Sequence, residues 1–165
     1  HRVEAVHYMA AIVVILEMSR PLTKTYWMNI TDDSVPFLGL IEHTNLMPRE
    51  LYGGNYVLYL TNYLDREDDM YTMPQHDLVA LYVKHLHKFN PDFDESWIKA
   101  VHYNALSAAQ PIAEPGYAER IPSHVTPVAG LYLANTTQIY PEDRGTNYSV
   151  RMGREVASLM LRNLA

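Results

Sequence analysis

The sequence predicts an α+β fold, with a mostly antiparallel or mixed β-sheet and helices on one side of it. Two observations carry this prediction. Four strand-like segments precede the first helix-like segment, and the later strands and helices do not alternate regularly. Residues 111–127 contain four prolines and should be mostly irregular. A regular strand–helix alternation would have predicted a parallel sheet instead.

The first strand is expected within the long apolar run at residues 3–18. Residues 12–15 are all β-branched, which favours a central strand over a buried helix. The run is nearly long enough to span a membrane, but Glu4, His7 and Glu17 lie too close to its middle for that. We therefore expect a strand in the interior of the sheet.

Further strands are expected downstream, separated by turn residues. Residues 56–63 alternate, so that Leu58 and Leu60 share one face and Val57 and Tyr59 the other. Other short apolar segments predict strands at residues 26–30, 37–42, 97–105 and 131–134.

Two helices are expected. Thr72, followed by Pro74 and Gln75, resembles a helix start with Thr72 as the cap, and this helix should run to about Phe89. The last helix should begin near Asn147 or Ser149, either of which is a candidate cap. Helical spacing places on one face of this last helix Val150, Gly153, Val156, Ala157, Met160 and Leu161.

Composition excludes several function classes. The chain has 165 residues, 48% hydrophobic and 19% charged, which indicates a globular protein with a real core. A net charge of −6 without a basic run argues against nucleic acid as a partner. The absence of cysteine removes disulfide and thiolate chemistry and is consistent with a cytoplasmic protein, with peripheral membrane contact left open. The eight histidines show no metal-ligand spacing, so no metal site is expected.

The strand, polar loop and helix of residues 130–161 resemble the C-terminal FAD-binding segment of one flavoprotein group, the amine oxidases, protoporphyrinogen oxidases and phytoene desaturases. In that group the start of the helix points at the flavin. The resemblance implies that Asn135, Thr136 and Thr137 meet the ribityl chain or pyrophosphate. It also implies that the flavin ring meets Asn147, Tyr148, Ser149 and Val150. The amine oxidases carry Gly-Thr-Glu where this chain has Asn-Thr-Thr, so the likeness there concerns the backbone.

The resemblance also implies a division of the chain. Residues 1–129 would form a substrate-binding domain, like that of the FAD-linked amine oxidases, and residues 130–165 the FAD-binding segment. No G-x-G-x-x-G is present, so we expect the dinucleotide-binding half to lie outside this sequence. The intact parent would then bind FAD, and this chain alone would be inactive and hold none.

The function implied is transfer of a hydride from a small organic substrate to the flavin. The thirteen tyrosines suit a flat apolar substrate, and the candidate pocket residues are His43, Asn45, Tyr59 and Tyr103. No catalytic residue stands out. Two alternatives remain open: a redox-neutral enzyme like the nucleotide-sugar mutases, and a stand-alone ligand-binding or interaction module without a cofactor.

Overall fold

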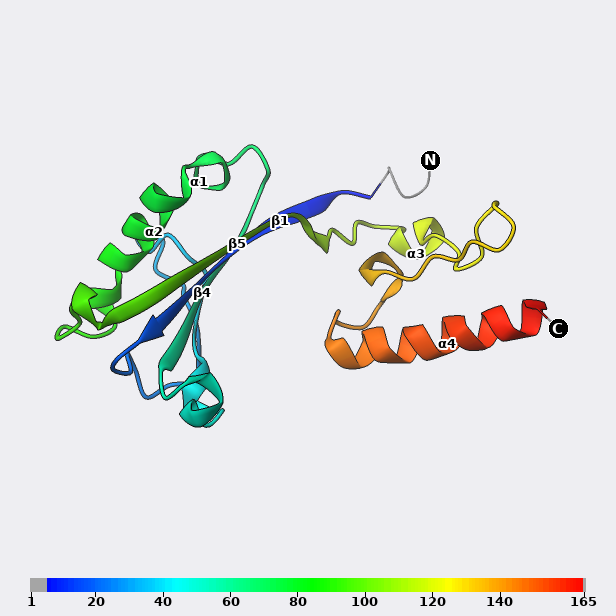
Figure 1. Cartoon of the computed structure of the whole chain (residues 1–165). Helices are drawn as coiled ribbons and strands as arrows, with labels where there is room; N and C mark the ends of the chain where they lie inside the picture. The colour runs from blue at the N-terminus through cyan, green and yellow to red at the C-terminus, as the bar shows by residue number, and fades with distance from the viewer. Residues whose placement is uncertain (1–5, 165) are drawn as a thin grey trace. The chain divides into compact units, whose positions relative to one another are not determined.

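A computed structural model describes residues 6–164 (Figure 1). The described chain divides into two compact units, residues 9–109 and residues 6–8 together with 110–164. The expected boundary between residues 129 and 130 lies inside the second of these units. We describe each unit by itself.

The first unit is built on a five-stranded sheet with strand order β2-β3-β4-β1-β5. β1 pairs with β4, β4 with β3 and β3 with β2, all antiparallel. β5 also runs antiparallel to β1, because two backbone hydrogen bonds link the opposite ends of the pair. At one end the Ser19 N–H donates to the Trp97 carbonyl, and at the other the Ile112 N–H donates to the His7 carbonyl. The α+β prediction is confirmed. The strands are β1 (Tyr8–Met18), β2 (Trp27–Asn29), β3 (Gly39–Glu42), β4 (Tyr56–Leu64) and β5 (Ile98–Pro111).

The central position of β1 is confirmed. Every second residue from Ala10 to Met18 is fully buried, and the intervening side chains are only partly covered. β-branched residues suit this position because their stiff side chains pack well on a pleated surface. The first residues of the predicted run, 3–5, lie outside the described part of the chain. No helix within residues 6–164 is both long enough and apolar enough to cross a bilayer.

Helix α2 (Gln75–Lys84) covers one face of the sheet (Figure 1). Its residues Leu78 and Tyr82, with Leu86 just beyond it, are fully buried against the core side chains of β1 and β4. The predicted cap was wrong: Thr72 ends a separate short helix, α1 (Asp69–Thr72), whose own cap is Asp68. Met73 is extended because it precedes Pro74, and this separates the two helices. A 3-10 turn, Leu86–Lys88, follows α2.

β5 is longer than predicted, because the strand continues through Leu106 to Pro111. Its alanine-rich second half has little intrinsic preference for a strand. The long neighbour β1 supplies the backbone hydrogen bonds that hold this segment extended.

The second unit contains α3 (Tyr117–Arg120) and α4 (Thr146–Leu164). The strand predicted at residues 131–134 is absent among the described residues, which show only an isolated bridge between Val125 and Tyr132. A strand needs a partner along its length, and here the partner extends no further than residues 124–126. Leu131 is accordingly 54% exposed.

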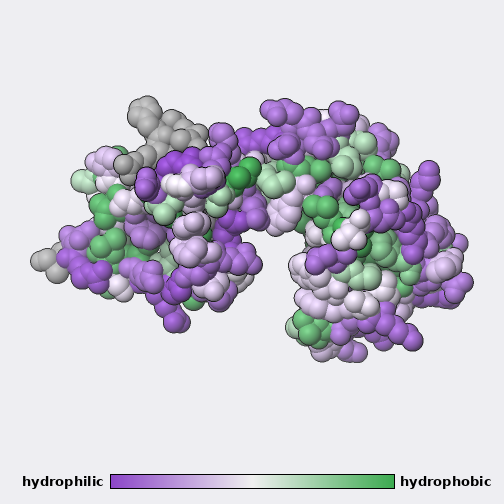
Figure 2. Space-filling view, turned by 180° about the vertical axis from the view of Figure 1, so that it is seen from behind, coloured by the Kyte–Doolittle hydropathy of each residue, from purple (hydrophilic) through white to green (hydrophobic). Residues whose placement is uncertain are grey.

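The apolar face predicted for α4 is only partly buried. Val156 is buried together with Met152 and Ile139, but Val150, Met160 and Leu161 are exposed. This cluster is too small to cover the whole predicted apolar face of α4. Figure 2 shows hydrophobic side chains at the surface of both units.

Candidate functional site

The face of the sheet opposite α2 carries a hollow of about 420 Å³. The sheet contributes apolar and aromatic side chains, Ile15 from β1 with Val57 and Tyr59 from β4. Residues of the 3-10 turn Arg49–Tyr52 and of the loop just after it close one side, and the side chains of Glu17 and His102 complete the lining. The remaining lining residues are Glu17, Leu51, Tyr52, Gly53, Asn55 and His102.

An aromatic group borders this hollow. The His43 Nε2 lies 2.6 Å from the Tyr52 hydroxyl oxygen, a short hydrogen bond between side chains. The His43 ring meets the Tyr52 and Tyr59 rings edge-on, with centroid distances of 5.1 Å and 5.5 Å. The structure thus brings together two of the predicted pocket residues, His43 and Tyr59. Tyr52 and Tyr59, which line the hollow, therefore present apolar rings with polar tips to it.

A chain of polar side chains crosses the same hollow. The Glu17 carboxylate accepts from Asn55 Nδ2 at 2.7 Å and contacts His102 Nε2 at 2.8 Å. Lys99 in turn donates to Asn55 Oδ1 at 2.8 Å. The hydrogen bonds from His102 and Asn55 lower the pKa of Glu17 below its usual value. Both carboxylate oxygens of Glu17 already have partners within the chain.

Four residues of this hollow were not predicted as site residues: Glu17, Tyr52, Asn55 and His102. One signal was present, since Glu17 is a charged residue at the end of an otherwise apolar central strand. Its partner His102 is 85 residues away, so only the pairing of β1 with β5 brings the two together.

Asn45 and Tyr103 lie elsewhere. The Asn45 amide donates to the Thr23 and Thr25 carbonyls at 3.1 Å and 3.3 Å and so holds the connection between β1 and β2. Tyr103 packs against the core on the α2 side of the sheet, where burial raises the pKa of its hydroxyl. It is therefore on the opposite face from Tyr59.

In the second unit, residues 135–138 form a self-capped 3-10 turn. Asn135 Oδ1 accepts from the Thr137 N–H at 3.0 Å, and Gln138 Oε1 accepts from the Asn135 N–H at 2.9 Å. The Thr137 side chain is fully buried, and its carbonyl accepts from the Tyr117 hydroxyl at 2.8 Å. Of the residues implied for the ribityl or pyrophosphate, only Thr136 has an exposed side chain.

Helix α4 begins at Thr146, so Asn147 and Ser149 lie inside it and neither is its cap. The Gly145 carbonyl accepts the first helical hydrogen bonds, from the Tyr148 and Ser149 N–H groups at 3.1 Å and 3.2 Å. Within residues 6–164, no acceptor is recorded for the backbone N–H groups of Thr146 and Asn147. These donors, at the positive end of a 19-residue helix, fit an electron-rich ligand edge such as a flavin ring.

The resemblance also implies flavin contacts for Tyr148 and Val150 on α4, and their side chains lie in different surroundings. Tyr148 packs against the small core of this unit, and the Arg151 guanidinium lies 4.9 Å from its ring centroid. The Arg151 guanidinium also donates to Glu142 Oε1 at 2.6 Å, and this hydrogen bond lowers the pKa of Glu142. Val150 is 52% exposed.

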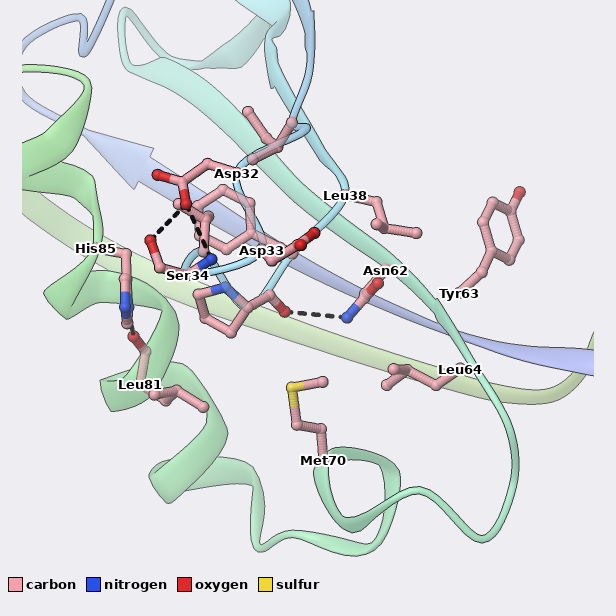
Figure 3. A pocket seen from close by; sticks show the side chains of 14 residues that line it. Asp32, Asp33, Ser34, Leu38, Asn62, Tyr63, Leu64, Met70, Leu81 and His85 are labelled. Atoms are coloured by element: carbon pink, nitrogen blue, oxygen red, sulfur yellow. Dashed lines mark hydrogen bonds between the residues drawn. The ribbon is translucent and has the colours of Figure 1, made fainter.

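A second hollow, of about 550 Å³, lies between the loop after β2, the strand β4 and helix α2 (Figure 3). Asp32 Oδ1 accepts from the Ser34 N–H at 2.9 Å, and Asn62 Nδ2 donates to the Pro36 carbonyl at 3.0 Å. Hydrogen bonds from Ser34 and then Lys88 lower the pKa of Asp32. None of the predicted site residues lines this hollow.

A metal centre finds no support in the described part of the chain. Across residues 6–164, no group of three His, Cys, Asp or Glu side chains has an arrangement that could hold a metal ion.

Comparison with known proteins extends these observations. No protein-family model matches the chain, and no curated protein sequence matches it. Among solved structures, a protein from Exiguobacterium sp. 255-15, provisionally described as a protoporphyrinogen oxidase, is 15% identical with a TM-score of 0.69, over 96% of this chain and 36% of that one. An oxidoreductase from Methanosarcina mazei is 16% identical with a TM-score of 0.62, over 93% of this chain and 36% of that one.

A third similar structure is a reduced UDP-galactopyranose mutase, 16% identical with a TM-score of 0.57, over 73% of this chain and 26% of that one. The chain therefore spans about a third or less of the length of the proteins it resembles. At such low identities, what is shared is the fold. The chain has the α+β fold found within these larger proteins.

Proposed function

We propose that this chain is the substrate-binding and C-terminal FAD-binding part of an FAD-dependent oxidoreductase. The observation that carries the proposal is the extent of the shared fold, which covers 96% and 93% of the chain in two proteins described as an oxidase and an oxidoreductase. The matched part includes both the sheet and α4. The resemblance of residues 130–161 to the FAD-binding segment of the amine oxidase group supports the same proposal independently of the fold.

The flavin, when bound, supplies the redox chemistry by accepting a hydride from the substrate. The chain's own residues would position the substrate and polarise the flavin. The free N–H groups of Thr146 and Asn147 would donate to a flavin edge that gains negative charge on reduction. On the sheet, the rings of His43, Tyr52 and Tyr59 would hold a flat substrate.

The proposal is tested on the complete protein as its gene encodes it. We expect the purified protein to be yellow, to release FAD on denaturation, and to lose its visible flavin absorbance when an organic substrate is added without oxygen. A complete protein that purifies without flavin and cannot be loaded with FAD would support the alternative of a cofactor-free binding module.

The role proposed for α4 can be tested with a matched pair of variants of the complete protein. Thr146→Pro removes one free N–H at the first helical position, where proline is well tolerated. Thr146→Ala keeps the N–H. Losing one donor to a charged group costs about 1–3 kcal/mol, so Thr146→Pro should lower the flavin reduction potential and weaken FAD retention. If both variants match the parent in potentiometric titration, the start of α4 does not contact the flavin.

A redox-neutral reaction is the second candidate, and the fold shared with the reduced UDP-galactopyranose mutase over 73% of the chain favours considering it. The two candidates differ in what they require. A mutase-like enzyme would turn over only after its flavin is chemically reduced, and the flavin would stay reduced afterwards. An oxidoreductase would itself reduce its flavin with substrate.

A further inference from the structure

The polar side chains at the hollow opposite α2 form one row in which the direction of each hydrogen bond is set. The row runs from Lys99 through Asn55 and Glu17 to His102. The Lys99 ammonium can only donate, so the Asn55 side-chain oxygen faces it and the Asn55 amide nitrogen donates to Glu17. An ionised carboxylate can only accept, so His102 carries a hydrogen on Nε2, 2.8 Å from Glu17 Oε1.

This row leaves the second ring nitrogen of His102 available. In a neutral imidazole that carries its hydrogen on Nε2, Nδ1 is a hydrogen-bond acceptor. Within residues 6–164, the hydrogen bond to Glu17 is made through Nε2, and no partner is recorded for Nδ1. The side chain lines the hollow and is about half exposed. The structure therefore holds an oriented acceptor that a ligand in the hollow can reach.

The aromatic part of the hollow lies next to this acceptor. In the pairing of β1 with β4, Ile15 lies opposite Tyr59, and Glu17 lies opposite Val57. All four residues line the hollow. Two residues along a strand span roughly 7 Å, so a planar ring that packs on Ile15 and Tyr59 would have its edge close to the polar row. The volume of about 420 Å³ is within the range of small-molecule sites.

We propose that the hollow selects a planar ring compound with a hydrogen-bond donor at its edge, such as a hydroxyl group, and that His102 Nδ1 accepts this hydrogen bond. The inference rests on the proposed function and names the substrate class of its sheet hollow. Glu17 is a positioning residue, because it acts on the ligand only by keeping the hydrogen of His102 on Nε2.

The experiment is an NMR titration of the full chain with two probes, phenol and anisole, at about pH 8, where imidazole side chains are mostly neutral. Both probes present the same ring, but only phenol has a hydroxyl donor. We expect both to shift the amide signals of the residues that line the hollow. Phenol should bind about 3- to 10-fold more tightly, which is the effect of one hydrogen bond.

Two variants test the acceptor. His102→Phe keeps a ring but has no acceptor, so the preference for phenol should disappear, whereas a structural disturbance would weaken both probes alike. Glu17→Gln should reduce the preference as well, because the glutamine amide can donate to Nε2 and so move the hydrogen of His102 to Nδ1. The control is His76→Phe, at an exposed position on α2, which should keep the preference of the parent.

Three results would overturn the proposal: no binding of phenol at the hollow, equal affinities of the parent for phenol and anisole, or a preference for phenol that persists in His102→Phe. Glu17→Gln provides the same comparison if His102→Phe does not fold. No flavin takes part in the titration. A negative result therefore rejects the role of His102, whereas a complete protein that cannot bind FAD would reject the proposed function.

Discussion

The carboxyl group of Glu42 gives the sharpest stability prediction. This side chain is fully buried at the end of β3. Its Oε2 accepts from the backbone N–H groups of Leu22 and Thr23 at 2.9 Å and 3.1 Å, but no partner for its Oε1 is found among the described residues. Burial raises the pKa of Glu42 from 4.5 to about 7, because the ionised form is poorly solvated there.

The direction of the pH dependence follows from this shift. The folded state holds the proton more tightly than the unfolded state, so the contribution of Glu42 to stability is fully present below pH 4.5 and is lost as the pH rises to about 7. At about 1.4 kcal/mol for each pKa unit, the rise from 4.5 to about 7 amounts to about 3 kcal/mol of unfolding free energy.

The assay is urea unfolding of the parent and of Glu42→Gln at several pH values between 4.5 and 7. Glutamine keeps an oxygen for the Leu22 and Thr23 N–H groups but does not titrate. The free energy of unfolding of the parent, relative to the variant, should fall by about 3 kcal/mol across this range. Glu50→Gln, at an exposed position, is the control and should run parallel to the parent. If Glu42→Gln also runs parallel to the parent, the Glu42 carboxyl does not retain its proton on folding.

Three further predictions concern the core, the hollow on the sheet and the cofactor. Val14→Asp should lower the free energy of unfolding by about 3–5 kcal/mol, because the new carboxylate has no partner in the core. The control Val13→Asp, on the face opposite α2, should cost clearly less, and equal melting temperatures for the two variants would contradict the orientation of β1. The pKa of Glu17, measured by NMR, should rise toward its usual value in Asn55→Ala, which removes one of the hydrogen bonds to the carboxylate, and an unchanged value would show that this bond is not formed. The purified 165-residue chain should show no flavin absorbance, and a yellow preparation with stoichiometric FAD would contradict that expectation.

Much of the sheet could be predicted from local pattern. The β-branched run in β1 and the alternation in β4 each identify a strand and also the face that it buries. The start of α2 was misplaced because two caps compete within a few residues. Asp68 caps the short helix α1, so Thr72 lies at the end of α1 and does not cap α2. Pro74 separates the two helices.

The candidate site was less accessible to sequence reasoning. His43 could be placed at the end of a strand and Tyr59 within one, but the contact of His43 with Tyr52 depends on a 3-10 turn that the sequence pattern does not predict. Tyr103 was placed in the pocket because a strand residue can face either side, and its side is set by the register with β1. The donors at the start of α4 also lie earlier in the helix than expected, because the Gly145 carbonyl already binds the N–H groups of Tyr148 and Ser149.

The loop after β2 has a consequence for the hollow in Figure 3. Asp32, which lines it, is paired with Lys88, whose Nζ lies 3.0 Å from Asp32 Oδ2, and both side chains are about half exposed. Its base is held by the nearly buried Asn62, which bonds to the Pro36 carbonyl. Added salt screens exposed ion pairs but barely affects a buried amide bond. Added salt should therefore weaken the Lys88–Asp32 pair and leave the bond between Asn62 and the Pro36 carbonyl intact, so the two ends of the loop after β2 should differ in their response to ionic strength.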